Sequence, residues 1–186
     1  VVITSVARDD LGDGGARHFA RCLAAVRQRL PHATLEVLVP DFGGDEGALQ
    51  VVLAARPDVL GHNLETCERL TPQIRSRAGY RRSRALRAAA KRRASHVRTK
   101  TGLMLGLGER DDEVVQVLRD ARASGVDLVT LGQYLRPSTQ NAPVERYVPP
   151  ERFAELAVLA RSLGFAHVES GPLVRSSFHA ERALLP

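Results

Sequence analysis

The sequence predicts an α/β protein that folds as a barrel of parallel strands, complete or partial. Six short, almost continuous apolar runs alternate with segments of helical periodicity, and buried strands of parallel sheets have this appearance. Polar residues cluster at the end of each run. In a parallel barrel all carboxyl ends of the strands meet at one mouth, whereas an open doubly wound sheet gathers its site at one switch point. The repeated polar ends therefore favour the barrel.

Strands and helices are expected in a regular order along the chain. We expect strands over residues 1–6, 33–39, 58–63, 101–108, 127–135 and 166–174. We expect helices over residues 15–30, 110–125 and 149–164. The second of these helices has acidic residues at 111–113, which complement the positive end of the helix dipole, and Gly125 is a plausible stop. The third opens with prolines that suit a first turn, and it ends at Gly164.

Composition indicates one domain over residues 1–186. This length suits a single domain with a sizeable core, and 44% hydrophobic residues favour a packed globule over disorder. No apolar run approaches membrane-spanning length, and no signal-peptide pattern opens the chain. Cys22 and Cys67 have no cysteine neighbour at a metal-binding spacing. We expect buried free thiols and a reducing compartment, either cytoplasmic or organellar, and of these we predict the cytoplasm.

Basic charge is concentrated in one stretch. The formal net charge is +6, and much of the excess lies in residues 75–100. This stretch is either the solvated face of a helix or a surface that attracts an acidic partner. Nucleic acid is not the expected partner, because aromatic residues make up only 4% of the chain and no nucleic-acid motif is present.

Three motifs at predicted strand ends have a chemical interpretation. "GHNLET" (61–66) places an amide and a carboxylate two residues apart, where both can grip the vicinal diol of a ribose. "GLMLGLGE" (102–109) carries three glycines that allow a flat ligand or another backbone to come close. "RDDLGDGGA" (8–16) leads from a strand into a helix, and free backbone N–H groups there would hold a carboxylate.

Together with "TLGQYLRPS" (130–138), "PVERYVPPERF" (143–153) and "GPLVRSSFHA" (171–180), these motifs strongly resemble lipoyl synthase, a family of radical S-adenosylmethionine enzymes. The resemblance implies a partial (β/α) barrel of the radical S-adenosylmethionine type. It also implies S-adenosylmethionine and two 4Fe-4S clusters as cofactors of the complete enzyme. In this family a radical abstracts hydrogen from an octanoyl chain on a carrier-protein lysine, and the auxiliary cluster supplies sulfur at two carbons.

The same resemblance implies partners and assigns residues. The implied partners are an octanoylated lipoyl-carrier protein or domain and an electron donor, ferredoxin or flavodoxin, with no nucleic acid and no membrane. Ser177 matches the serine that ligates the auxiliary 4Fe-4S cluster, and Arg175 lies nearby. Other positions match residues that bind S-adenosylmethionine in the family. They are Asn63 and Glu65 at its ribose; Gly102, Gly106 and Glu109 near its adenine; Gln133 and Tyr134 along the same cavity; Gly14 and Gly15 near the amino group of its methionine part; and Arg82 for the carboxylate of that part.

One departure from the family pattern is large. Neither of its three-cysteine motifs is present, and Cys22 and Cys67 do not match cluster ligands. In the family these motifs precede the stretch that begins at Val1, together with the first barrel strand. We therefore expect a fragment that lacks the first strand, holds no catalytic residue of its own and is inactive alone. Its run 1–6 would be an exposed apolar edge. A natural cluster-free paralogue is the alternative.

Two other functions are weighed against this one. A different barrel enzyme would use a Schiff-base lysine, but Lys100, the one candidate, lies at the wrong end of its strand. A non-catalytic barrel module would bind an acidic lipoyl-carrier domain through the Arg-rich stretch 75–100.

Overall fold

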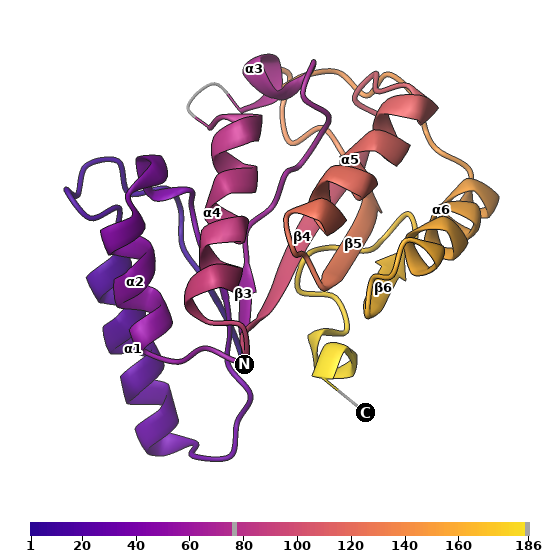
Figure 1. Cartoon of the computed structure of the whole chain (residues 1–186). Coiled ribbons are helices and arrows are strands. Elements are labelled where there is room, and N and C mark those ends of the chain that lie inside the picture. Colours follow the sequence, from indigo (N-terminus) through magenta and orange to yellow (C-terminus); the bar gives the residue numbers. More distant parts are fainter. Residues whose placement is uncertain (76–77, 185–186) are drawn as a thin grey trace.

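The computed structural model describes residues 1–75 and 78–184. The expected single domain of 1–186 therefore includes residues 76–77 and 185–186, which lie outside the described part. Six strands form one sheet, and each strand pairs in parallel with its neighbours in the sequence (Figure 1). The strands are β1 (Val2–Thr4), β2 (Glu36–Leu38), β3 (Val59–Gly61), β4 (Arg98–Leu105), β5 (Leu128–Gln133) and β6 (His167–Ser170).

The strand order decides between the two α/β architectures. The order β1-β2-β3-β4-β5-β6 never reverses, whereas a doubly wound sheet reverses its order at the switch point. Because β1 and β6 are the two ends of this order, the sheet curves without closing. The predicted partial parallel barrel is confirmed.

Helices cover one face of the sheet, as Figure 1 shows. They are α1 (Ala16–Arg29), α2 (Glu46–Ala54), α3 (Thr71–Ile74), α4 (Tyr80–Arg93), α5 (Asp111–Ala123) and α6 (Pro150–Ser162), with short 3-10 segments at Phe42–Gly44 and Ala180–Leu184. Two apolar clusters fill the space between the sheet and the helices, one under α1, α2 and α4 and the other under α5 and α6. None of the helices in the described part is long and apolar enough to cross a membrane.

The inner face of the sheet carries charge at the amino ends of the strands. Lys100 on β4 reaches across β3 to Glu36 on β2, with Nζ 2.8 Å from Oε1, and both side chains are buried. Gly61 is the residue that pairs with Lys100 on the intervening strand. Because Lys100 is held in a buried ion pair with Glu36, the Schiff-base alternative loses its one candidate lysine.

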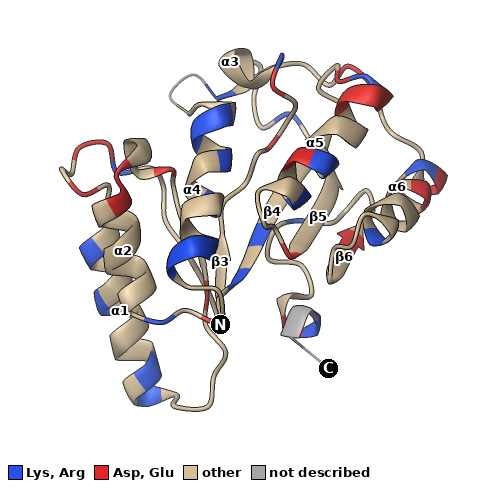
Figure 2. Cartoon of the chain, viewed as in Figure 1, with Lys and Arg blue, Asp and Glu red and all other residues tan. Residues whose placement is uncertain are grey.

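Residues 80–93 of the Arg-rich stretch form α4, whose basic positions Figure 2 shows, and several of its charges are paired with acids of the same chain. Arg82 pairs with Asp41, Arg84 with Asp120, Lys91 with Asp127 and Arg93 with Glu46. These acids come from other elements, so the basic residues fasten α4 to its surroundings. The interpretation as a solvated, internally paired helix face is therefore favoured over a surface that steers an acidic partner.

The two cysteines differ in burial. Cys67 is buried, as predicted, and burial raises the pKa of its thiol. Cys22 is only partly buried, because it lies on the flank of α1 beside the unpaired edge of β1. The expectation of two buried thiols is therefore wrong for Cys22.

His62 follows β3 directly and is almost completely buried on the side of α4. Its Nδ1 lies 2.9 Å from the Val39 carbonyl oxygen, and its Nε2 lies 2.8 Å from the Ser83 hydroxyl. Burial lowers the pKa of His62 from 6.5 to about 3. The folded protein therefore holds this imidazole neutral, and it joins β3 to α4 as a structural residue.

Stability should consequently fall as the pH drops below the unfolded-state pKa of 6.5, because the unfolded chain takes up a proton there and the folded one does not. Between pH 7 and pH 5 we expect His62 to account for a loss of about 2 kcal/mol in the free energy of unfolding. Urea unfolding of the wild type and of His62→Gln at both pH values measures this loss. Equal pH dependence in the two proteins would refute the neutral, buried imidazole.

Candidate functional site

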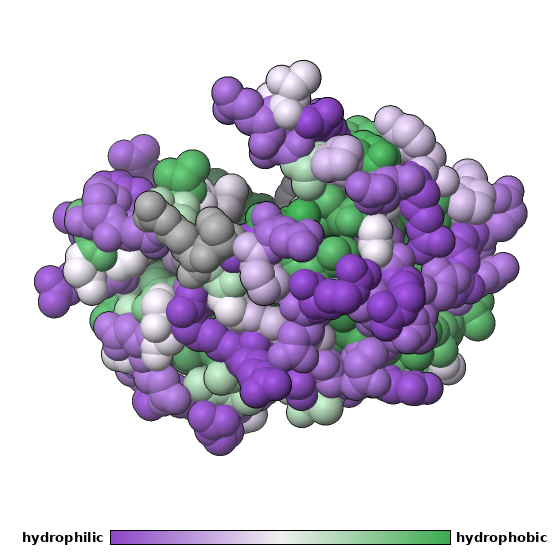
Figure 3. Space-filling model, turned by 90° about the horizontal axis from the view of Figure 1, so that it is seen from above, coloured by the Kyte–Doolittle hydropathy of each residue, from purple (hydrophilic) through white to green (hydrophobic). Residues whose placement is uncertain are grey.

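A cavity lies at the carboxyl ends of the strands, where the sequence predicts the site. We call it the mouth cavity; its volume is about 340 Å³. Its lining residues come from β2 to β5, from the turns that follow them and from the C-terminal segment: Leu38, Asn63, Glu65, Gly102, Leu103, Met104, Thr130, Gly132, Gln133, Leu135, Val174, Arg175 and Ser176. Figure 3 views the molecule from this end, with apolar surface exposed between polar rims.

A second hollow of about 320 Å³ adjoins the mouth cavity. The two share Leu38, Asn63 and Glu65, and the second extends to Arg75 and Asp41. Together the two neighbouring hollows offer an apolar wall, an amide–carboxylate pair and a guanidinium. This combination is typical of sites for small polar molecules with an apolar part.

Asn63 and Glu65 are held rigidly beside β4. The Glu65 N–H donates to the Gly102 carbonyl oxygen at 3.0 Å, and the Glu65 carbonyl oxygen accepts from the Met104 N–H at 2.7 Å. Glu65 has a φ of +67°, so the chain turns sharply at this point. The Asn63 amide donates to Glu65 Oε1 at 3.0 Å, which orients both side chains as the motif predicted.

The surroundings of Glu65 make its carboxylate a strong acceptor. Burial raises the pKa of Glu65, while the hydrogen bond from Asn63 and the charge of Arg75 act in the opposite direction. A carboxylate withdrawn from water gains more from a hydroxyl donor than an exposed one does. Two adjacent hydroxyl groups would satisfy the acceptor capacity that Asn63 leaves open.

Gly102 forms the floor of the mouth cavity between Asn63 and Thr130. A Cβ atom at this position would lie 2.9 Å from Asn63 Oδ1 and 3.0 Å from Thr130 Oγ1. Any larger residue would therefore push these polar groups apart and fill the space above the strand. The geometry at Gly102 is thus compatible with the close approach that the sequence predicted there.

The C-terminal segment closes one side of the cavity by crossing β5 at Gly132. A Cβ atom on Gly132 would collide with the Val174 carbonyl group. The Gln133 N–H donates to the Pro172 carbonyl oxygen at 3.2 Å, and the Arg175 guanidinium donates to the Val174 carbonyl oxygen at 2.7 Å. These contacts turn Arg175 and the following serine toward the cavity.

Other predicted residues hold the rim rather than line it. Glu109 accepts from the N–H groups of Gly106 and Leu107 at 2.7 and 2.8 Å, so its carboxylate shapes the turn after β4. The Tyr134 hydroxyl donates to the Ala142 carbonyl oxygen at 2.9 Å. Gly106, Glu109 and Tyr134 are not among the residues that line the cavity.

Gln133 does both. It lines the mouth cavity, its Oε1 accepts from the Val148 N–H at 2.9 Å, and its Nε2 donates to the Arg146 carbonyl oxygen at 3.1 Å. The Gln133 side chain therefore fixes the long connection between β5 and α6 over the rim.

The start of α1 does not offer free donors. Asp13 accepts from the N–H groups of Gly15 and Arg17, both at 3.0 Å, and Gly14 donates to the Leu11 carbonyl oxygen. The expectation that free N–H groups there hold a carboxylate is wrong, because Asp13 already caps this helix. Gly14 and Gly15 do not line the mouth cavity or the adjoining hollow.

Arg82, predicted to bind the carboxylate of the cofactor, and Ser177, predicted to ligate the auxiliary cluster, lie at the margin of the site. Arg82 pairs with Asp41 at 2.6 Å, whereas Arg75, which the sequence gave no reason to choose, lines the adjoining hollow and donates to the Asn63 carbonyl oxygen at 2.9 Å. Ser177 is exposed and directly follows Ser176, which does line the mouth cavity.

Sequence comparison identifies relatives over almost the whole chain. Lipoyl synthase of Thermus thermophilus is 52% identical over 100% of this chain, and that of Methylococcus capsulatus is 56% identical over 98%. The chain belongs to the lipoyl synthase family. It spans 58% and 57%, respectively, of the length of these two lipoyl synthases. No protein-family model matches the chain.

A solved structure supports the fold. The crystal structure of methylornithine synthase aligns with a TM-score of 0.66 at 16% identity, over 95% of this chain and 58% of that one. At this identity the likeness concerns the fold alone, which is a partial barrel of parallel strands.

Among the described residues, no three His, Cys, Asp or Glu side chains are grouped closely enough to bind a metal ion. Cys22 lies on α1 and Cys67 precedes α3, in different parts of the fold. That cluster ligands are missing from this chain stays a prediction from its sequence.

Replacement of Gly132 by alanine should release the C-terminal segment, because the added methyl group displaces the Val174 carbonyl. We expect a loss of about 1–3 kcal/mol in the free energy of unfolding and faster tryptic cleavage after Arg175. The matched control is Gly12→Ala, whose methyl group would meet nothing within 4 Å. Cleavage of Gly132→Ala at the control's rate would contradict the contact.

Proposed function

We propose that this chain forms the S-adenosylmethionine-holding part of a lipoyl synthase, which inserts two sulfur atoms into an octanoyl chain attached to a carrier-protein lysine. One observation carries the proposal: the Asn63–Glu65 pair stands beside the open floor at Gly102, in a cavity that the segment 172–176 closes. Membership of the family supports it further. The carrier protein, the electron donor and a cytoplasmic location are part of the same proposal.

The residues of the cavity fit the cofactor in three ways. Asn63 and Glu65 would hold the two ribose hydroxyls, and the missing side chain of Gly102 leaves space for a flat base next to Thr130. The cofactor's carboxylate would lie near Arg75 rather than Arg82, because Arg82 is paired with Asp41. When bound, S-adenosylmethionine would supply a 5′-deoxyadenosyl radical, on taking up one electron from an iron–sulfur cluster that the rest of the enzyme would hold.

The chain's own contribution is binding, orientation and exclusion of water. Leu38, Leu103, Met104 and Val174 give the mouth cavity an apolar wall, where an alkyl chain would be shielded from solvent. Ser177 stays the proposed ligand of the auxiliary cluster, with Arg175 beside it. The residues present do not complete that site, so activity requires the rest of the enzyme.

The alternative of a non-catalytic module that binds an acidic carrier domain through α4 has less support. Four of the basic side chains of this helix are engaged in ion pairs with acids of the same chain. Their attraction to an external acidic surface is reduced accordingly.

Glu65→Gln tests the ribose site. Loss of the charge should weaken S-adenosylmethionine binding by about tenfold or more, because charge-assisted hydrogen bonds are about twice as strong as neutral ones. The matched control is Glu68→Gln, which removes an exposed carboxylate three residues further along. Calorimetric titration of the wild type and both variants is the measurement.

An activity assay accompanies the titration. The chain is joined to the upstream part of the Thermus thermophilus relative, the clusters are reconstituted, and lipoyl formation on an octanoylated carrier domain is followed by mass spectrometry. The Glu65→Gln hybrid should lose activity and the Glu68→Gln hybrid should keep it. Equal binding and equal activity of the two variants would refute the proposed ribose contact, and a folded, cluster-loaded hybrid without product would refute the proposed function.

A further inference from the structure

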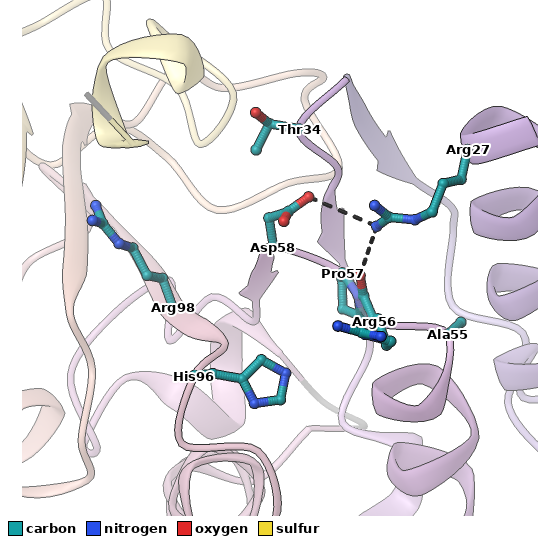
Figure 4. A pocket seen from close by; sticks show the side chains of 8 residues that line it. All are labelled: Arg27, Thr34, Ala55, Arg56, Pro57, Asp58, His96 and Arg98. Carbon is teal, nitrogen blue, oxygen red and sulfur yellow. Dashed lines mark hydrogen bonds and ion pairs between the residues drawn. The ribbon is translucent and has the colours of Figure 1, made fainter. Parts of the chain in front are cut away.

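The two ends of the sheet differ in how their polar side chains are satisfied. At the amino ends of β2, β3 and β4, a cavity of about 620 Å³ contains Arg27 and Asp58, which already have partners in the chain (Figure 4). The Asp58 carboxylate accepts from the Leu35 N–H at 2.8 Å and lies 3.8 Å from Arg27. Arg27 donates to the Arg56 carbonyl oxygen at 2.7 Å. The mouth cavity, at the carboxyl ends, contains a buried hydroxyl group that has no such partner among the described residues.

This hydroxyl belongs to Thr130 on β5. Thr130 is only 4% exposed and lines the mouth cavity, and it pairs in register with Gly102 on β4. None of the hydrogen bonds that the described residues form with one another involves its Oγ1. Buried side-chain hydroxyls have a hydrogen-bond partner in the large majority of cases. The exception at Thr130 therefore indicates that a molecule bound in the cavity supplies the partner.

The Thr130 hydroxyl shares the space above Gly102 with the Asn63 amide. A Cβ atom on Gly102 would lie 3.0 Å from Thr130 Oγ1 and 2.9 Å from Asn63 Oδ1. The two oxygen atoms thus flank the same space, which glycine leaves open, and they approach it from different strand ends. A molecule that lies on Gly102 is within reach of both.

The two oxygen atoms differ in what they accept and donate. The Asn63 amide nitrogen donates to the Glu65 carboxylate, so Oδ1 is the atom that faces Gly102, and it accepts hydrogen bonds only. The Thr130 hydroxyl carries a proton for which the described residues provide no acceptor. The space above Gly102 therefore suits a molecule with a hydroxyl donor on one side and an acceptor next to it. In an adenosine, the acceptor nearest the ribose hydroxyls is N3 of the base.

We propose that Thr130 determines specificity for the base of the cofactor, because its hydroxyl donates a hydrogen bond to N3 of adenine. This inference rests on the proposed function, which places the ribose at Asn63 and the base next to Thr130. A base with nitrogen at this position satisfies the buried hydroxyl. A base with a C–H group there leaves the hydroxyl unpaired, and an unpaired buried hydroxyl costs binding free energy.

Calorimetric titration of the whole chain with S-adenosylmethionine tests the contribution of the hydroxyl. Thr130→Val should bind about three- to tenfold more weakly than the wild type, since it loses one neutral hydrogen bond. Thr130→Ser keeps a hydroxyl and should restore most of the affinity. The matched control is Thr99→Val, since the Thr99 hydroxyl donates to the Gly125 carbonyl oxygen at 2.7 Å and does not line the mouth cavity. Its affinity should equal that of the wild type.

Analogues of the base test the position of the contact. The probes are S-adenosylhomocysteine and its 3-deaza and 7-deaza analogues, each of which has one ring nitrogen replaced by a C–H group. The wild type should bind the 3-deaza analogue about three- to tenfold more weakly than the parent compound and the 7-deaza analogue as tightly as the parent. Thr130→Val should not distinguish the 3-deaza analogue from the parent. A purely structural role of Thr130 would not produce this loss of discrimination.

Thermal unfolding separates binding from folding. Thr130→Val should unfold at the wild-type temperature or above it, because no hydrogen bond within the chain is lost, whereas Thr99→Val should unfold at a lower temperature. Unchanged S-adenosylmethionine binding by Thr130→Val, or equal discrimination against the 3-deaza analogue in this variant and the wild type, would overturn the contact and leave the proposed function standing. Absence of S-adenosylmethionine binding by the wild type would overturn both.

Discussion

The close contact between the Val174 carbonyl and Gly132 is the constraint on which the site depends. Only a residue without a side chain allows the C-terminal segment to lie directly on β5. Backbone hydrogen bonds from Gly171 to Leu131 and from Gln133 to Pro172 continue the pairing beyond β6. As a result, Arg175 and Ser176 from near the end of the chain line the same cavity as Asn63 and Glu65 from its first half. Two motifs that are distant in the sequence thus form one cavity.

The inner face of the barrel is open at the mouth because glycines replace side chains there. Gly61, Gly102 and Gly132 lie on three adjacent strands, and at each one a Cβ atom would come within 3.4 Å of a neighbouring group. Toward the amino ends, the buried Lys100–Glu36 pair occupies the interior instead. A complete small barrel is filled with packed side chains; this partial barrel keeps a cavity, with the apolar clusters confined to the helix side of the sheet.

Strands and helices that depend on local sequence patterns could be predicted from the sequence. All six strands were found, as were α1, α5 and α6, because their apolar periodicity and end signals are strong. The last strand was predicted too long: it ends at Ser170, since Gly171 and Pro172 begin a turn. The start of β4 was missed, because Arg98 and Lys100 face the inside of the barrel and interrupt the apolar run.

Within the site, the motif predicted Asn63, Glu65, Gly102 and Gln133, and all four line the mouth cavity. Arg75 was missed since only the fold brings it beside Asn63. Gly132 was missed because its role depends on a segment that returns from the C-terminus. The free backbone N–H groups expected at the start of α1 were predicted wrongly, because the Asp13 carboxylate accepts a hydrogen bond from the Gly15 N–H. Sequence spacing shows which residues share a strand end, whereas pairing across strands decides which of them meet.

We propose that residues 61–66 and 172–176 form two sides of a single S-adenosylmethionine cavity. Hydrogen exchange of the chain, measured by mass spectrometry with and without S-adenosylmethionine, tests this arrangement. We expect slower exchange in both segments over the same range of cofactor concentration, with no change along α4. Protection of one segment alone, or of neither while the cofactor binds, would show that the two segments do not share the cofactor.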